Sequence, residues 1–92
     1  MRRCKQTDEM KSAKVQFWRN TIFLLRTMRL DEYEFALSCN YSENGFHSAM
    51  TQGCLSLDMA FVICKQLAEP LDDMFFKDYA SEWKKKNVKE II

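Results

Sequence analysis

The chain has 92 residues, of which 47% are hydrophobic and 29% are charged, and its formal net charge is +1. This balance is typical of one small globular domain and excludes an intrinsically disordered chain. Only 2 Gly and 1 Pro occur, which argues against a sandwich or barrel that needs many tight turns. The composition therefore predicts an all-α fold.

The longest apolar runs of the sequence cover only Ile22–Leu25 and Met59–Cys64. A membrane-spanning helix needs about 20 apolar residues in succession, so we expect no membrane partner. The first residues are basic but no apolar stretch follows them, which is unlike a secretory signal peptide. The expected location is therefore the cytoplasm.

The 4 cysteines are Cys4, Cys39, Cys54 and Cys64, and no C-x-x-C pair occurs. Free thiols that serve as small core residues explain this pattern better than disulfides or a metal site. A zinc site that combines cysteines with His47 would need spacings unlike those of structural zinc clusters. His47 is also the only histidine, so no histidine pair or triad can be built around it. We expect no enzyme, no cofactor and no bound metal.

The net charge hides a sharp partition along the chain. Residues 1–29 carry eight basic and two acidic residues, whereas residues 30–76 carry one basic and eight acidic residues. Residues 77–92 again have a basic excess, with five lysines against three acidic residues. An acidic centre thus lies between two basic arms. Solvated helix faces with a basic tail explain this partition as well as a functional surface does.

Residues 1–12 are polar and lack hydrophobic periodicity, and we interpret them as a flexible basic arm. From about Ser12 to Arg29, apolar residues recur at three- and four-residue steps, which predicts an amphipathic helix. The expected inner face of this helix consists of Val15, Trp18, Ile22, Leu25 and Met28.

Asp31 is positioned to cap a second, short helix, and Glu34 completes a capping-box-like pair three residues later. This helix is expected to end near Ser38 or Cys39. Asn40 then marks a turn, because Asn tolerates the left-handed conformation better than other non-glycine residues do.

Ser42 is expected to cap a third helix that runs to about Thr51, and Ser56 is expected to cap a fourth helix. Pro70 ends the fourth helix, because proline lacks the backbone N–H that a helix interior requires. A single fifth helix is predicted from the spacing of Leu71, Met74, Phe75, Tyr79 and Trp83. The resulting units are a flexible basic arm at 1–12, a domain at 13–76, and a helical extension with a basic tail at 77–92.

The chain holds more large aromatic residues than five short helices can easily bury. Those in question are Trp18, Phe23, Phe61, Phe75, Phe76, Tyr79 and Trp83. Either the last helix packs over the core, or the surplus forms an apolar strip that joins two copies of the chain.

Two short helices that are joined by a tight turn and bracketed by longer helices describe a helix-turn-helix. The stretch from Leu30 to Ser42 resembles the opening of the XRE-like (Cro/lambda-repressor-like) helix-turn-helix domain, roughly L-S-x-x-x-L-A-x-x-L-G-V-S. Ala36 matches the small residue at the helix crossing, and Asn40 stands where the family usually has Gly. Similar matches are found at Thr21–Arg26, Ser56–Leu67 and Leu71–Phe75. The resemblance covers about residues 17–76 and implies a compact bundle of five helices.

In the XRE-like family, the third helix lies in the major groove of DNA and the first residues of the second helix contact phosphates. The resemblance therefore implies a small sequence-specific DNA-binding transcriptional regulator that acts as a homodimer on double-stranded DNA. The residues of this chain that match the DNA-contacting positions are Ser42, Glu43, Asn44, His47, Ser48, Thr51, Gln52 and Glu32.

The charge of this expected surface departs from the family pattern. No Lys or Arg occurs between Leu30 and Ile63, although phosphate neutralisation by such residues supplies most nonspecific DNA affinity. Glu43 can still accept from a cytosine amino group and Asn44 can pair with adenine, while the basic arms supply charge. The alternative is a helix-turn-helix module, such as an antitoxin or antirepressor component, whose acidic surface binds a basic protein partner.

Overall fold

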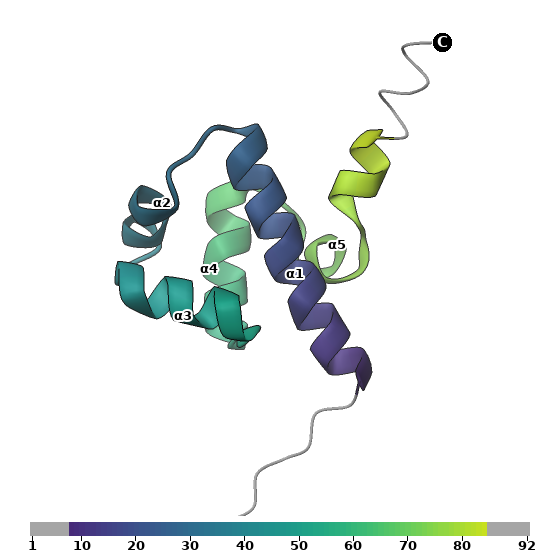
Figure 1. The fold of residues 1–92 in the computed structure, drawn as a ribbon, viewed down its shortest axis with the longest axis horizontal. Helices are drawn as coiled ribbons and strands as arrows, with labels where there is room; N and C mark the ends of the chain where they lie inside the picture. Colours follow the sequence, from purple (N-terminus) through teal and green to yellow (C-terminus); the bar gives the residue numbers. More distant parts are fainter. Residues whose placement is uncertain (1–7, 85–92) are drawn as a thin grey trace, which may run out of the picture.

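The computed structural model describes residues 8–84, with side chains from Ser12 onward. Over this range the chain is helical and contains no strand, so the prediction of an all-α fold is confirmed. Five labelled helices follow one another and a further helical segment covers residues 79–84 (Figure 1). The labelled helices are α1 (Asp8–Thr27), α2 (Glu32–Ser38), α3 (Glu43–Gln52), α4 (Leu57–Leu67) and α5 (Leu71–Phe76).

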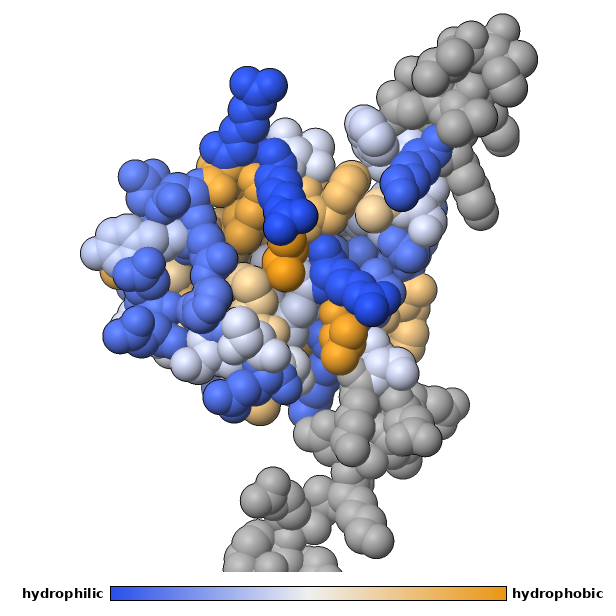
Figure 2. All heavy atoms as spheres, viewed as in Figure 1, coloured by the Kyte–Doolittle hydropathy of each residue, from blue (hydrophilic) through white to orange (hydrophobic). Residues whose placement is uncertain are grey.

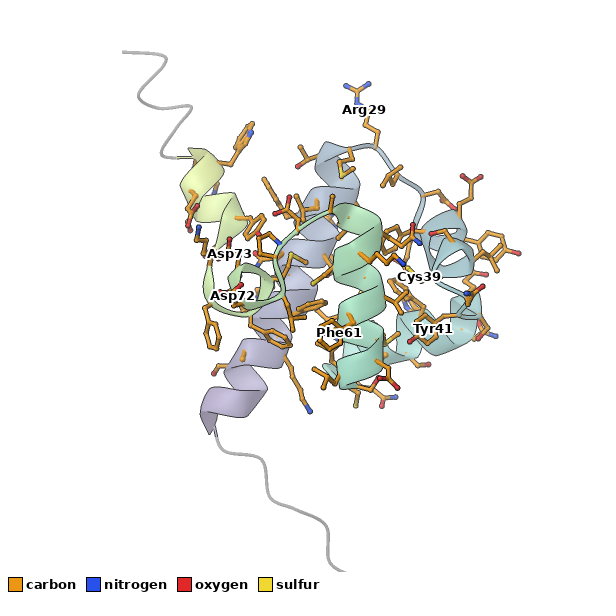
Figure 3. All side chains as sticks on the ribbon, turned by 180° about the vertical axis from the view of Figure 1, so that it is seen from behind. Arg29, Cys39, Tyr41, Phe61, Asp72 and Asp73 are labelled. Atoms are coloured by element: carbon orange, nitrogen blue, oxygen red, sulfur yellow. The ribbon has the colours of Figure 1, made fainter. Side chains whose placement is uncertain are left out.

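The helices are arranged around α1, which crosses the middle of the molecule (Figure 1). Helices α2 and α3 lie on one side of α1, and α5 lies on the other side with the helical segment 79–84. Helix α4 covers the back of this arrangement, which Figure 3 turns toward the viewer. Helix α1 begins at Asp8 and not near Ser12, so residues 8–12 of the predicted flexible arm are helical and that part of the prediction was wrong. Residues 1–7 of the predicted arm and residues 85–92 of the predicted tail lie outside the described residues.

The buried face of α1 differs by about one residue from the predicted one. Trp18 and Leu25 are buried as expected, but Val15 and Met28 are exposed. The face that packs into the core runs through Phe17 and Thr21 instead. The prediction was wrong here because it counted only apolar side chains, whereas the true face includes the hydroxyl of Thr21, which donates to the Phe17 carbonyl at 2.9 Å.

The three expected N-caps are confirmed. The side chains of Asp31, Ser42 and Ser56 each accept a hydrogen bond at 3.1 Å from the backbone N–H three residues later. These bonds satisfy N–H groups that have no partner inside the helix. The cap formed by Ser42 explains why residue 45 is a glycine, because a Cβ at this position would lie only 3.0 Å from Ser42 Oγ.

The predicted single helix from Leu71 to Trp83 is wrong, so the described residues contain six helical segments instead of five. Helix α5 ends at Phe76, Lys77 is extended (φ −95°, ψ 152°), and the carboxylate of Asp78 caps the next segment by accepting from Ser81 N at 3.2 Å. An amide side chain from α1 occupies this break, and its hydrogen bonds replace those that a continuous helix would make.

The side chain of Asn20 fills the break and is 1% exposed. Its Nδ2 donates at 2.7 Å to the carbonyl oxygens of Met74 and Lys77. Its Oδ1 accepts from Tyr79 N and from Gln16 Nε2, both at 3.1 Å. One buried amide thereby holds both C-terminal helical segments against α1.

The aromatic surplus divides between core and surface. Trp18 is buried, and Phe75 and Tyr79 pack against the core, whereas Phe76 is 79% exposed and Trp83 is 51% exposed. The Tyr79 hydroxyl donates to Glu69 Oε1 at 2.9 Å, and burial together with this carboxylate raises the pKa of Tyr79. The last segment therefore covers part of the core, while Phe61, Phe76 and Trp83 each remain more than half exposed.

The described cysteines are free thiols. Cys39 and Cys64 are buried among apolar residues, as the sequence predicts, and Cys54 is exposed. Burial, followed by the nearby charge of Glu69, raises the pKa of Cys64 to about 11. Burial also raises the pKa of Cys39. Both buried thiols are therefore protonated at neutral pH. Since only the thiolate is reactive, Cys39 and Cys64 serve as packing residues.

The substitution Asn20→Ala is expected to lower the free energy of unfolding by about 2–4 kcal/mol, because it leaves two buried carbonyls and one N–H without their partner. Urea denaturation followed by circular dichroism measures the change. The matched control is Asn44→Ala at an exposed position of α3, for which we expect less than about 0.5 kcal/mol. Equal effects of the two substitutions would contradict the role given to the buried amide.

Candidate nucleic-acid interface

Helices α2 and α3 form one unit through a four-residue connection, residues 39–42. Within it, Asn40 adopts the left-handed conformation (φ 67°), as its position in the sequence predicts. The N–H of Tyr41 donates to the Ala36 carbonyl at 2.9 Å and closes the turn. Figure 3 shows Cys39 and Tyr41 at this connection, beside α4. The turn therefore sets the direction in which α3 leaves α2.

The inner face of this unit is fixed by close packing. Ala36 and Phe46 are fully buried, and the ring of Phe46 meets those of Phe35 and Trp18 edge to face, with centroids 6.0 and 5.3 Å apart. The Trp18 indole also donates to the Cys54 carbonyl at 3.0 Å and secures the loop after α3. With one side of α3 held in this way, the opposite side faces solvent.

The outward side of α3 carries the residues that the sequence predicts as DNA contacts. All of them except Glu32 are exposed, and Glu32 is half-buried on α2. The exposed set is Ser42, Glu43, Asn44, His47, Ser48, Thr51 and Gln52. The structure thus brings the predicted set together on one face, which we call the α3 face.

Several side chains of the α3 face bond to one another or to the helix. His47 Nδ1 lies 3.0 Å from Glu32 Oε2, so an exposed hydrogen bond joins α3 to α2. The Thr51 hydroxyl lies 3.1 Å from the carbonyl oxygens of both His47 and Ser48. Within the described part of the chain, the side chains of Glu43 and Asn44 make no hydrogen bond or ion pair. Glu43 and Asn44, together with the hydroxyl of Ser48, can therefore bond to a ligand without breaking a contact between described residues.

The α3 face and its surroundings are acidic. Asp31, Glu32, Glu34 and Glu43 lie on α2, α3 or their caps, and hydrophilic side chains gather over these helices in Figure 2. The described cation nearest in sequence to α2 is Arg29, at the turn that Figure 3 labels. Negative charge therefore dominates this side of the molecule.

Arg29 ends α1 in a conformation that usually favours glycine. Its backbone is left-handed (φ 57°), although it carries a long side chain. The N–H of Leu30 still donates to the Leu25 carbonyl at 2.8 Å and closes α1. A non-glycine residue in this conformation costs about 1–2 kcal/mol. The local geometry is thus one that glycine would adopt without this cost.

Three of the described cations gather on the other side of α1. Arg19, Arg26 and Lys84 line a groove between α1 and the segment 79–84. This grouping was not predicted, because more than fifty residues separate Lys84 from the two arginines. The seven-residue spacing of Arg19 and Arg26 on one helix is the signal that could have indicated it.

Among residues 8–84 there is no group of three or more His, Cys, Asp or Glu side chains placed to hold a metal ion. No described helix is both long enough and apolar enough to cross a membrane. Comparisons with protein-family models, with curated proteins and with solved structures each found no match.

The substitution Ala36→Leu is expected to lower the free energy of unfolding by about 1–3 kcal/mol, because added methyl groups overpack the contact between α2 and α3. Thermal unfolding followed by circular dichroism measures it. Ser12→Leu makes a similar enlargement at an exposed position of α1 and is expected to change stability by less than about 0.5 kcal/mol. An unchanged melting temperature for the Ala36 variant would show that the two helices do not cross closely there.

Proposed function

We propose that this chain is a small sequence-specific DNA-binding transcriptional regulator of the XRE-like helix-turn-helix type, with α3 in the major groove. The observation that carries the proposal is the α3 face, a row of exposed polar side chains on a helix whose other side is fixed by Phe46. An α-helix about 10–12 Å wide fits a major groove that is about 12 Å wide. A rigid helix with an exposed polar face is what base recognition requires.

Two side chains are suited to contact base edges. The amide of Asn44 can pair with the N6 and N7 groups of adenine, and the carboxylate of Glu43 can accept from the amino group of cytosine. Both are exposed and uncommitted in the first turn of α3. His47 and Ser48, one turn further along, extend the same face toward neighbouring base pairs.

The start of α3 is suited to contact a phosphate. Ser42 satisfies the N–H of Gly45, so the N–H groups of Glu43 and Asn44 remain directed outward at the helix N-terminus. Such N–H groups, together with the helix dipole, favour a phosphate oxygen. This contact orients α3 without adding a basic side chain.

The acidic charge around α3 limits nonspecific DNA affinity. Arg29, close to α2 in the sequence, offsets part of this acidic charge. The basic residues of the predicted arm offset more of it, and those before Asp8 lie outside the described residues. We expect removal of residues 1–7 to weaken binding to every DNA sequence and to flatten its salt dependence.

One alternative is supported by the same charge distribution. A face that includes Glu32 and Glu43, on two helices that carry no Lys or Arg, is complementary to a basic protein. Under this hypothesis the chain is an interaction module, such as an antitoxin or antirepressor component. Removing negative charge from α3 would then weaken binding to the basic protein, whereas under the DNA hypothesis it would strengthen binding to DNA.

The two functions are separated by selecting from random DNA duplexes at moderate salt, followed by affinity measurements. We expect a motif to be enriched, Asn44→Ala to weaken binding to that motif by about 1–3 kcal/mol, and Glu43→Gln to strengthen nonspecific binding. Glu82→Gln, which removes the same charge on the segment 79–84, is the control and is expected to change little. If a folded protein enriches no motif, the DNA proposal fails.

We further propose that the chain acts as a homodimer, as DNA-binding domains that recognise two half-sites commonly do. The apolar surface at the C-terminal side supports this, because Phe76 on α5 is 79% exposed. A separate apolar surface on α4 consists of the exposed pair Leu57 and Phe61, and Figure 3 labels Phe61.

Sedimentation equilibrium of the full chain is expected to give a dimer, and Phe76→Ser is expected to shift it toward monomer because an exposed ring loses its partner surface. Phe61→Ser on α4 is the matched control and is expected to leave the dimer intact. A monomer for the unmodified chain at high concentration would contradict the dimer. If Phe61→Ser dissociates the dimer and Phe76→Ser does not, the interface lies on α4.

A further inference from the structure

A groove of about 460 Å³ runs between α1 and the helical segment 79–84. Its charged lining comes from both elements, with Arg19 and Arg26 on α1 and Lys84 opposite them. Its apolar lining consists of Ile22 and Phe23, both half-buried. Figure 2 shows hydrophilic side chains flanking apolar ones along α1. The groove thus combines an apolar floor with basic edges.

The positive charge of the groove is not neutralised inside the described part of the molecule. Arg19, Arg26 and Lys84 form no ion pair there. Asp78 is the acidic residue of the lining, and its two carboxylate oxygens accept from the N–H and the hydroxyl of Ser81 at 3.2 and 3.0 Å. These bonds, with a smaller effect of Arg19, hold the pKa of Asp78 below its usual range. The groove therefore has more positive than negative charge and favours an anionic occupant.

The groove has a fixed shape because both of its walls are anchored. Asn20 holds the chain at Lys77 and Tyr79 against α1. The ring of Trp83 packs on Phe23 with centroids 6.3 Å apart. A surface that is formed before binding loses little conformational entropy when a partner docks.

The groove and α3 lie on opposite sides of α1. Figure 1 shows α3 on one side of α1 and the segment 79–84 on the other. DNA bound along α3 therefore leaves the groove to a second molecule, which is not the DNA of the proposed function.

The spacing of the basic residues defines the occupant. Arg19 and Arg26 are seven residues apart, which is two turns or about 10.5 Å along α1, and the apolar floor lies between them. A second helix packed alongside α1 matches this pattern when two carboxylates lie seven residues apart with apolar side chains between them. No two acidic residues of this sequence are seven apart, so a second copy of the chain does not supply this pattern.

We propose that the groove docks an acidic amphipathic helix of a partner protein. The two carboxylates of that helix pair with Arg19 and Arg26, and its apolar side chains cover Ile22 and Phe23. Lys84 contributes a third positive charge from the opposite wall. A DNA-binding regulator with such a groove recruits the partner on the side that is not occupied by DNA.

The test is a titration of the ¹⁵N-labelled full chain with a synthetic helical peptide of about 15 residues that carries two Glu residues seven apart with Leu between them. We expect resonances of residues 19–26 and 79–84 to shift and affinity to fall with salt. The same peptide with Lys in place of Glu is expected not to bind. Arg26→Gln is expected to weaken binding about fivefold, and the double variant Arg26→Gln/Lys84→Gln about tenfold or more.

Lys65→Gln removes an exposed charge from α4 and is the matched control, for which we expect unchanged peptide affinity. The inference is overturned if the peptide shifts no groove resonance, if the shifts lie on α2 and α3, or if the control weakens binding as much as Arg26→Gln. A separate DNA-binding measurement also overturns the inference if Arg26→Gln weakens DNA binding more than peptide binding, because the groove then belongs to a DNA surface. The peptide titration itself contains no DNA, so failure of the DNA proposal leaves the outcome of the titration unchanged.

Discussion

The buried amide of Asn20 is the interaction on which the C-terminal half of the structure depends. A polar side chain is stable in the interior only when its hydrogen bonds are made, and Asn20 makes four of them at a point where α5 stops. The chain thereby changes direction between Phe76 and Tyr79 instead of continuing as one helix. This change of direction places the last segment beside α1 and creates the groove between them.

The parts of the fold that local chemistry determines are those that the sequence predicts well. Asp31, Ser42 and Ser56 cap helices because each accepts from an N–H only three residues away, and Asn40 adopts its left-handed turn for reasons internal to a few residues. The break after α5 was not predictable in this way. Its cause is a side chain 54–59 residues earlier, and nothing in the apolar spacing of Leu71 to Trp83 indicates it.

The candidate site shows the same division between local and distant causes. The exposure of Glu43, Asn44 and His47 follows from helix periodicity once Phe46 is placed in the core. The bond between His47 and Glu32 joins residues 15 apart on different helices, so it requires the tertiary arrangement. The groove also requires the tertiary arrangement, because its walls meet through Asn20 and through the contact of Phe23 with Trp83.

The separation of charge across α1 connects the two proposed surfaces. Under the proposed function, acidic side chains on the α3 face weaken the attraction to phosphates that every DNA sequence offers equally. Discrimination would then depend to a larger extent on base contacts such as the one proposed for Asn44. On the other side of α1, Arg19 and Arg26 line the groove and would not be needed to neutralise a DNA backbone bound at α3. A molecule with all its cations beside α3 would lack this second surface. The distribution of charge is therefore consistent with the two proposals together, because each surface has a charge suited to a different partner.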